Sequence, residues 1–204
     1  MRIPTDHFRN PAALSRFLLV CLVGLTLDLW SKSYSFAHLR PADAPDDGRP
    51  RVVRFIDGWL HFEITTNHGA VFGLGQGQKW LFLGVSVVAI GFLGYLFATS
   101  GRQRFYQFIL GLLLGGVLGN MYDRVAFGHV RDMIHALPGW RWPGAWQVPL
   151  VGYPGAGREV FPFIFNVADI LLCVGVGLMV AYSLVAPAAG KDEAREDRPS
   201  PAVS

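Results

Sequence analysis

Residues 105–123 read FYQFILGLLLGGVLGNMYD, an apolar run whose last residues include an asparagine and an aspartate. Because an α-helix rises about 1.5 Å per residue, a run of this length crosses the roughly 30 Å hydrocarbon core of a bilayer. Three further runs are similarly long and apolar, at residues 13–36, 79–99 and 164–186. The sequence therefore predicts an all-α membrane protein with four transmembrane helices.

The composition agrees with a membrane protein and excludes other classes. Hydrophobic residues make up 51% of the chain and charged residues 16%, which is too apolar for a soluble domain of 204 residues. The net charge of +3 comes without a basic stripe interleaved with aromatic residues, so we expect no nucleic-acid partner. Cys21 and Cys173 lie inside apolar runs, where a thiol behaves as a small hydrophobe. The first run contains Asp28 and Lys32 and is too long for a secretory signal, which indicates a retained helix.

The connections between the runs predict the topology. Residues 100–104 form a short turn between the second and third runs, whereas residues 37–78 and 124–163 are long polar loops. Both long loops must therefore lie on one side of the membrane. Basic residues in short segments carry the positive-inside bias, which places both termini in the cytoplasm. These residues are Arg2, Arg9, Arg16, Arg102 and Arg104.

The first long loop has the pattern of a small β-sheet. Residues 52–55 and 60–64 are rich in β-prone side chains and follow a turn-rich opening. We expect two or three short strands that rest on the outer membrane surface. Trp59 and Trp80 are expected near the interface, where aromatic belts form.

The rest of the chain is expected to be irregular. Residues 138–157 are rich in Trp, Pro and Gly, which favours irregular structure along the membrane surface. Residues 187–204 mix Pro, Ala and charges and are predicted to form a disordered cytoplasmic tail. Residues 1–186 are then interpreted as one membrane-embedded domain.

Charged side chains in the apolar runs need a partner or a task, because each costs about 2.5 to 3.5 kcal/mol on insertion scales. Asp28 and Lys32 are spaced i, i+4 on one helix face, which predicts an ion pair and favours a structural role over a catalytic one. Gly111, Gly115 and Gly119 share the same spacing in the third run, which favours close helix packing.

A polar cluster ends the third run. Asn120, Asp123 and Arg124 lie at i, i+3 and i+4, and therefore near one helix face. Asp123 and Arg124 fit a cap or an interface anchor. The side chain of Asn120 offers donors that can hold a peptide carbonyl.

The same topology brings two aspartates to one leaflet of the membrane. Asp132 lies beyond the third run, and Asp169 lies near the start of the fourth. A single loop joins these runs, so the end of one and the start of the other meet at the same leaflet. Two carboxylates within hydrogen-bonding reach share a proton, and such a pair can activate water and polarise a peptide carbonyl. The spacing alone also fits the alternative that each aspartate is a helix cap or an interface anchor.

Other catalytic schemes lack their motifs. The sequence has no HExxH and no paired Cys/His spacing, so a zinc site is not expected. No serine lies in a nucleophile-elbow pattern, and the glycine-rich residues 152–157 lack the Lys-Ser/Thr pair of a phosphate-binding loop.

Five short blocks carry a family resemblance. They are DLWSK (residues 28–32), NHGAVFG (67–73), GGVLGNMYDR (115–124), GHVRD (128–132) and FNVAD (165–169). In this order, and spread over the four predicted helices, they resemble the lipoprotein signal peptidase family, also called signal peptidase II.

The resemblance implies a four-helix fold with an outward-facing β-cradle in the bacterial inner membrane. It implies cleavage of diacylglyceryl-modified prolipoproteins just before the lipidated cysteine, with Asp132 and Asp169 as catalytic pair and no metal or organic cofactor. Membrane lipids are the expected surroundings and a monomer the expected state. The residues aligned with substrate-binding positions are Asn67, Gly69, Asn120, Arg124 and Asn166, and those aligned with supporting polar positions are Asp28, Lys32 and Asp123.

Three features depart from the family pattern. Arg131 stands where an apolar residue is usual, Ile170 replaces a small residue, and the connection from Ala136 to Phe163 is long. Arg131 either lowers the pKa of Asp132 or faces lipid headgroups, and the residues alone leave both alternatives open.

Two alternative functions are a transport or channel component and an inactive lipoprotein-binding scaffold. A transport pathway predicts charges spread through the membrane depth, whereas the polar residues cluster at one leaflet. An inactive scaffold would lose the aspartate pair, and both aspartates are present.

Overall fold

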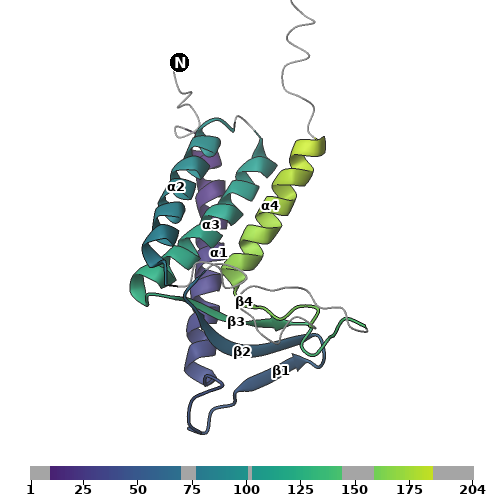
Figure 1. The fold of residues 1–204 in the computed structure, drawn as a ribbon. Helices are drawn as coiled ribbons and strands as arrows, with labels where there is room; N and C mark the ends of the chain where they lie inside the picture. Colours follow the sequence, from purple (N-terminus) through teal and green to yellow (C-terminus); the bar gives the residue numbers. More distant parts are fainter. Residues whose placement is uncertain (1–9, 70–76, 101–102, 144–158, 186–204) are drawn as a thin grey trace, which may run out of the picture.

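The computed structural model describes residues 10–69, 77–100, 103–143 and 159–185, and these form four long helices and a four-stranded antiparallel sheet (Figure 1). Each helix is long and apolar enough to cross a membrane. The four predicted spans are therefore confirmed. The helices are α1 (Pro11–His38), α2 (Lys79–Ala98), α3 (Arg104–Ala126) and α4 (Val167–Val185).

The fourth helix differs from its prediction at its beginning. The apolar run starts at residue 164, but Ile164 and Phe165 form a short strand and α4 begins at Val167. Asn166 separates the two elements because its side-chain oxygen accepts the N–H of Asp169 at 3.1 Å, as an N-cap does. The tail predicted to be disordered, residues 187–204, lies outside the described residues.

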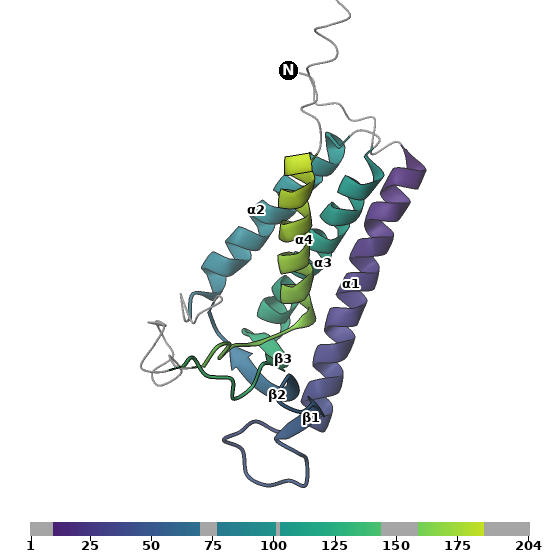
Figure 2. The same ribbon diagram turned by 90° about the vertical axis from the view of Figure 1, so that its right-hand side faces the viewer.

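The topology agrees with the loop lengths. The beginning of α1 and the end of α4 lie at the end of the bundle opposite the sheet (Figures 1 and 2). Both long connections therefore emerge at the sheet end, as predicted. Figure 2 also shows α1 continuing past the other helices to the level of the sheet.

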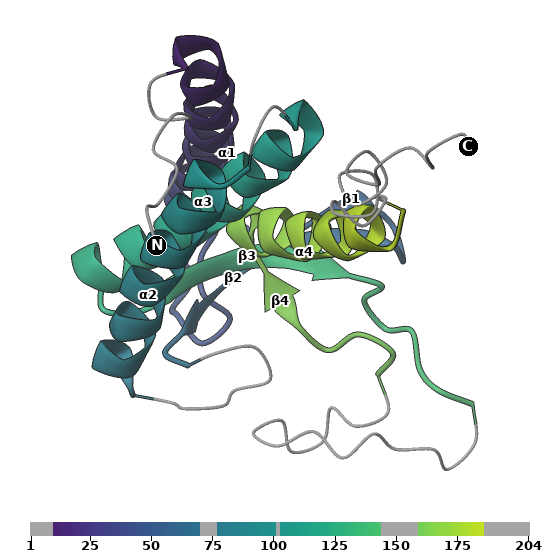
Figure 3. The ribbon, with the colours of Figure 1, turned by 90° about the horizontal axis from the view of Figure 1, so that it is seen from above.

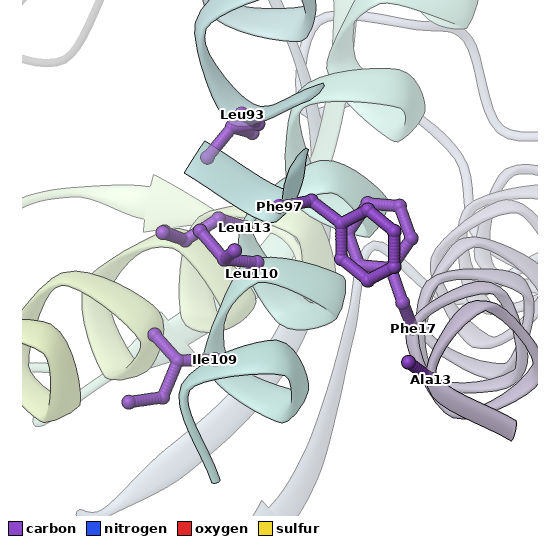
Figure 4. Packing of buried hydrophobic residues seen from close by; sticks show 7 residues of the cluster. All are labelled: Ala13, Phe17, Leu93, Phe97, Ile109, Leu110 and Leu113. Carbon is purple, nitrogen blue, oxygen red and sulfur yellow. The ribbon is translucent and has the colours of Figure 1, made fainter. Parts of the chain in front are cut away.

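An apolar core joins α1, α2 and α3 at the end away from the sheet (Figure 4). The rings of Phe17 and Phe97 stack with their centroids 4.4 Å apart, and Leu110 is fully buried beside them. The outer faces remain apolar, since Val88 is 72% exposed and Leu184 is 80% exposed. Exposed apolar side chains on long helices are typical of a surface covered by lipid.

Glycines bring α3 against α1, as their spacing predicts. A Cβ atom added at Gly111 would lie 2.8 Å from the backbone oxygen of Phe17, and one at Gly115 would lie 3.0 Å from that of Cys21. A Cβ at Gly119 would overlap the carboxylate of Asp28. The glycine stripe therefore lets two backbones touch and, at its lower end, leaves room for a buried charge.

The sheet lies across the lower ends of the helices (Figures 1 and 3). Its order is β1-β2-β3-β4, and all neighbours are antiparallel. Asp132 of β3 pairs with Thr65 of β2, and Ile134 pairs with Phe165 of β4. The strands are β1 (Val52–Ile56), β2 (Leu60–Asn67), β3 (Val130–Ala136) and β4 (Ile164–Phe165).

The first loop supplies two strands, as predicted, and the second supplies two that the sequence did not predict. β3 reads VRDMIHA, in which Arg131 and Asp132 interrupt the apolar pattern although five consecutive residues are buried. A strand buried on both faces lacks the alternation that identifies a half-buried strand. Of the segment predicted to be irregular, residues 144–157 lie outside the described residues.

Candidate active site

Asp132 and Asp169 come from two different elements, β3 and α4, and line the same cavity. Asp132 lies in β3 and is 2% exposed, whereas Asp169 lies in the first turn of α4 and is half-buried. β3 is hydrogen-bonded to β4, and β4 leads directly into α4. The sheet therefore delivers both carboxylates to the base of the helix bundle, and both line the same cavity.

Asn166 joins the two aspartates. Its backbone N–H donates to Asp169 Oδ2 at 3.2 Å, and its side-chain oxygen accepts the N–H of Asp169 at 3.1 Å. This reciprocal pair resembles a capping box, in which the N-cap residue and the third helical residue hold each other. The side-chain Nδ2 of Asn166 donates to Asp132 Oδ1 at 2.6 Å. Asp169 therefore is a helix cap, as one alternative predicted, and it also shares a hydrogen-bonding partner with Asp132.

Burial governs the protonation of Asp132. Desolvation, followed by the nearby charge of Asp169, raises the pKa of Asp132 to about 7. The amides of Asn166 and Asn67 act in the opposite direction, because each donates a hydrogen bond to the carboxylate. Between about pH 4 and pH 7, Asp132 therefore holds a proton, whereas an ordinary aspartate is ionised in this range.

Asn120 of α3 connects Asp169 to a buried lysine. Its Nδ2 donates to Asp169 Oδ1 at 2.9 Å, and its Oδ1 accepts from Lys32 Nζ at 3.1 Å. Because an ammonium group only donates, Lys32 fixes which end of the Asn120 amide faces Asp169. Both ends of this amide are thus used within the protein.

Lys32 also holds two buried carboxylates. Its Nζ lies 2.7 Å from Asp28 Oδ2 and 3.3 Å from Asp123 Oδ2, and all three side chains are fully buried. The ion pair predicted from the i, i+4 spacing is thus confirmed, with a second acid added. Asp28 Oδ1 accepts the backbone N–H of Ala168 at 2.8 Å. Asp28 therefore ties α1 to the first turn of α4, where the free N–H groups favour an anion.

Arg131 binds Asp123 and does not reach the membrane surface. Its guanidinium donates to Asp123 Oδ1 from Nε at 3.1 Å and from Nη2 at 2.8 Å, and stacks over the ring of Phe127 at 4.2 Å. The side chain is 8% exposed, so it does not face lipid headgroups. The side chain makes no described contact with Asp132, whose pKa is raised by burial and by the charge of Asp169. Arg131 is instead the partner of Asp123.

Arg124 and Asn67 hold the segment that follows β2. Arg124 Nη2 donates to the backbone oxygen of Gly69 at 3.1 Å, and the N–H of Gly69 donates to Asn67 Oδ1 at 2.9 Å. The guanidinium of Arg124 lies 4.9 Å from the centre of the Phe82 ring. Residues 70–73 of the matched block lie outside the described residues.

The cavity has a volume of about 630 Å³ and two unlike ends. Its polar end contains both aspartates, and its apolar wall comes from α2, α3, α4 and the segment before β4. Four predicted polar residues do not line the cavity and are fully buried next to the residues that do: Asp28, Lys32, Asp123 and Asn166. The predicted site residues that line the cavity are Asn67, Gly69, Asn120, Arg124, Asp132 and Asp169.

The apolar wall was not predicted from the sequence, although two signals for it exist. Phe82, Val85, Ser86 and Ala89 of α2 line the cavity and follow the i, i+3, i+4, i+7 spacing of one helix face. Phe161, Phe163 and Phe165 line it at every second position, as on one face of an extended chain. Within the described residues, no group of three or more His, Cys, Asp or Glu side chains is arranged to hold a metal ion.

Sequence comparisons find related proteins. The family model described as Signal peptidase (SPase) II matches residues 20–185. A lipoprotein signal peptidase of Halalkalibacterium halodurans is 31% identical over 164 residues, which cover 80% of this chain and 88% of that protein. One of Rhodopirellula baltica is 33% identical over 182 residues, which cover 82% of this chain and 70% of that protein.

Solved structures share the fold. A protein described as a bacterial membrane enzyme, solved by the in meso method, superposes with a TM-score of 0.64 at 24% identity. The alignment covers 90% of this chain and 93% of that one. The arrangement of four helices over a small sheet is therefore an architecture that bacterial membrane enzymes use.

Proposed function

Because this chain belongs to the signal peptidase II family of bacterial membrane proteases, we propose that Asp132 and Asp169 form the catalytic pair with which it cleaves lipid-modified prolipoproteins. The cut falls just before the diacylglyceryl-modified cysteine. One observation carries this proposal: Asn166 binds both carboxylates at the polar end of a single cavity. Residues 1–186 act as one peptidase domain.

The two carboxylates take different roles in the proposed reaction. Asp169 lies at the N-terminus of α4 and accepts the backbone N–H of Asn166, and it serves as the general base. Asp169 accepts a proton from a water molecule while the water oxygen attacks the scissile carbonyl carbon. Asp132, protonated below about pH 7, donates its proton to the carbonyl oxygen. Collapse of the tetrahedral intermediate breaks the C–N bond: the proton on Asp169 passes to the leaving amine, and one hydroxyl of the intermediate returns its proton to Asp132 as the new carboxyl group forms.

The two ends of the cavity match the two parts of the substrate. The apolar wall accommodates the acyl chains of the modified cysteine, because a diacylglyceryl group loses little by moving from lipid to an apolar groove. Asn67, Gly69 and Arg124 lie at the polar end and face the peptide main chain. Gly69 lets the peptide approach closely because it has no side chain.

The location of the pair supports a membrane orientation. The sheet and both aspartates lie at one end of the bundle, opposite the beginning of α1 and the end of α4. With both termini in the cytoplasm, the active site lies near the outer leaflet of the inner membrane. A signal peptide that spans the membrane then presents its modified cysteine at that depth.

Cleavage of a synthetic precursor tests the proposed function. The purified protein in bilayers should release one product that begins with the diacylglyceryl cysteine, as mass spectrometry would show. The same peptide without lipid should react on the order of 100-fold more slowly, because it lacks the acyl chains that partition it into the bilayer and hold its scissile bond beside the pair. Cleavage at another bond, or equal rates on both peptides, would contradict the proposal.

A further inference from the structure

Four charged side chains form a cluster behind the cavity, namely Asp28, Lys32, Asp123 and Arg131, which we call the charge cluster. The first three are fully buried, and Arg131 is 7% exposed. Arg131 binds Asp123 through three groups: its backbone N–H at 2.9 Å, its Nε at 3.1 Å and its Nη2 at 2.8 Å. Charges taken out of water are tolerated when they are balanced and hydrogen-bonded, and these four are both.

The charge of Arg131 balances the cluster. Asp28 and Asp123 contribute two negative charges, and Lys32 contributes one positive charge. Arg131 supplies the second positive charge through Asp123. Without it, one ammonium group would serve two buried carboxylates, and the cluster would carry a net negative charge beside the catalytic pair.

The cluster reaches the catalytic pair through one side chain. Lys32 Nζ has three protons, and three acceptors surround it: Asp28 at 2.7 Å, Asn120 at 3.1 Å and Asp123 at 3.3 Å. The bond to Asn120 Oδ1 turns the amide so that Nδ2 faces Asp169 at 2.9 Å. Lys32 and Arg131 bind the same carboxylate, that of Asp123.

We propose that Arg131 is a positioning residue: by neutralising Asp123 it leaves Lys32 free to hold Asn120, which orients Asp169 for catalysis. This inference rests on the proposed function. Arg131 itself contacts neither Asp132 nor Asp169 through its described hydrogen bonds, and its remaining donor, Nη1, lies 3.5 Å from Ser33 Oγ. Its effect on the reaction therefore travels through the charge cluster.

Other charged groups surround this cluster. They are Arg124 of α3, His129 of the turn before β3, Asp132 of β3 and Asp169 of α4. The pKa of His129 is lowered first by burial and then by His68, so this ring is neutral near pH 7. Arg124 is retained in every variant described below. A change in the protonation of Asp132 or Asp169 between these variants is then caused by the substitution of Arg131.

Arg131→Met tests the proposal, with Arg131→Lys as its conservative counterpart. The methionine variant should lose about 10-fold to 100-fold in kcat with little change in KM, as a catalytic group held slightly out of place does. The net negative cluster should raise the pKa of Asp132, so the alkaline limb of the pH–rate profile moves to higher pH. Arg131→Lys should recover most of the rate and the wild-type profile.

Arg40→Met provides the matched control. Arg40 is similarly buried, at 9% exposed, and is ion-paired at 3.3 Å with Asp46, but it lies outside the charge cluster. This variant should change stability and leave kcat and the pH profile as in the wild type. If Arg131→Met lowers only the unfolding midpoint, as this control does, then Arg131 is merely structural and the proposal is wrong.

A second readout does not depend on cleavage. In protein with ¹³C-labelled aspartate, the Asp132 carboxyl should titrate at higher pH in Arg131→Met than in the wild type. Should the wild type fail to cut the lipidated precursor, the proposed function fails while this titration still decides whether Arg131 acts on the pair. Identical titrations in the two proteins would overturn the positioning role.

Discussion

Replacing either Asp132 or Asp169 with asparagine should slow cleavage of a diacylated precursor by about 10⁴-fold, because each variant removes one half of the acid–base pair. The amide of Asp132→Asn cannot donate a proton of the required acidity to the carbonyl oxygen. The amide of Asp169→Asn cannot accept a proton from water. Asparagine has nearly the shape of aspartate, so both variants should keep the fold. Product formation in single-turnover reactions measures the loss.

The exposed acid of the β1–β2 turn serves as the control. The Asp57 side chain is 86% exposed and lies outside the cavity, so Asp57→Asn should leave the rate unchanged. Helical circular dichroism should be the same in all three variants. Either active-site variant retaining the wild-type rate would exclude the aspartate pair as the catalyst, whatever the family of the chain.

Lys32→Met should destabilise the protein by about 3 to 5 kcal/mol, the usual cost of removing one partner of a buried ion pair. Asp28 and Asp123 would each lose a bond to the ammonium group, at 2.7 Å and 3.3 Å, in a fully buried place. Methionine fills a similar volume, so the loss reports on charge more than on packing. Denaturant unfolding in detergent micelles measures it.

Lys79→Met is the matched control for this effect. Lys79 is half-buried at the start of α2, and its ammonium group lies 5.8 Å from the Trp80 ring. A cation at such a place contributes little to stability, so this variant should unfold within about 1 kcal/mol of the wild type. Equal unfolding curves for Lys32→Met and the wild type would show that the charge cluster contributes nothing to stability.

Much of the fold follows from the sequence because the membrane imposes a simple length rule. A bilayer demands about 20 apolar residues per span, and the chain has four such runs. One short and two long connections then require that both long loops share a side. That requirement alone brings Asp132 and Asp169 to the same end of the bundle.

The sequence was less informative about contacts between distant segments. β3 and β4 were not predicted, because a strand buried on both faces lacks alternation and a two-residue strand lacks any pattern. The partner of Arg131 also depends on tertiary structure. Asp123 lies in the last turn of α3 and Arg131 lies in β3, so their contact depends on the turn between the two elements. The role of Asn166 depends on three of its atoms, of which two bind Asp169 and one binds Asp132, and no spacing in the sequence reveals these contacts.

Titration of the Asp132 carboxyl tests the central claim most directly. Its ¹³C signal, identified by its absence in Asp132→Asn, should titrate near pH 7 in the wild type. Because the charge of Asp169 helps to raise this pKa, Asp169→Asn should move the titration to lower pH. A titration near the ordinary aspartate value of about 3.9, unchanged by Asp169→Asn, would show that the two carboxylates do not act as a pair.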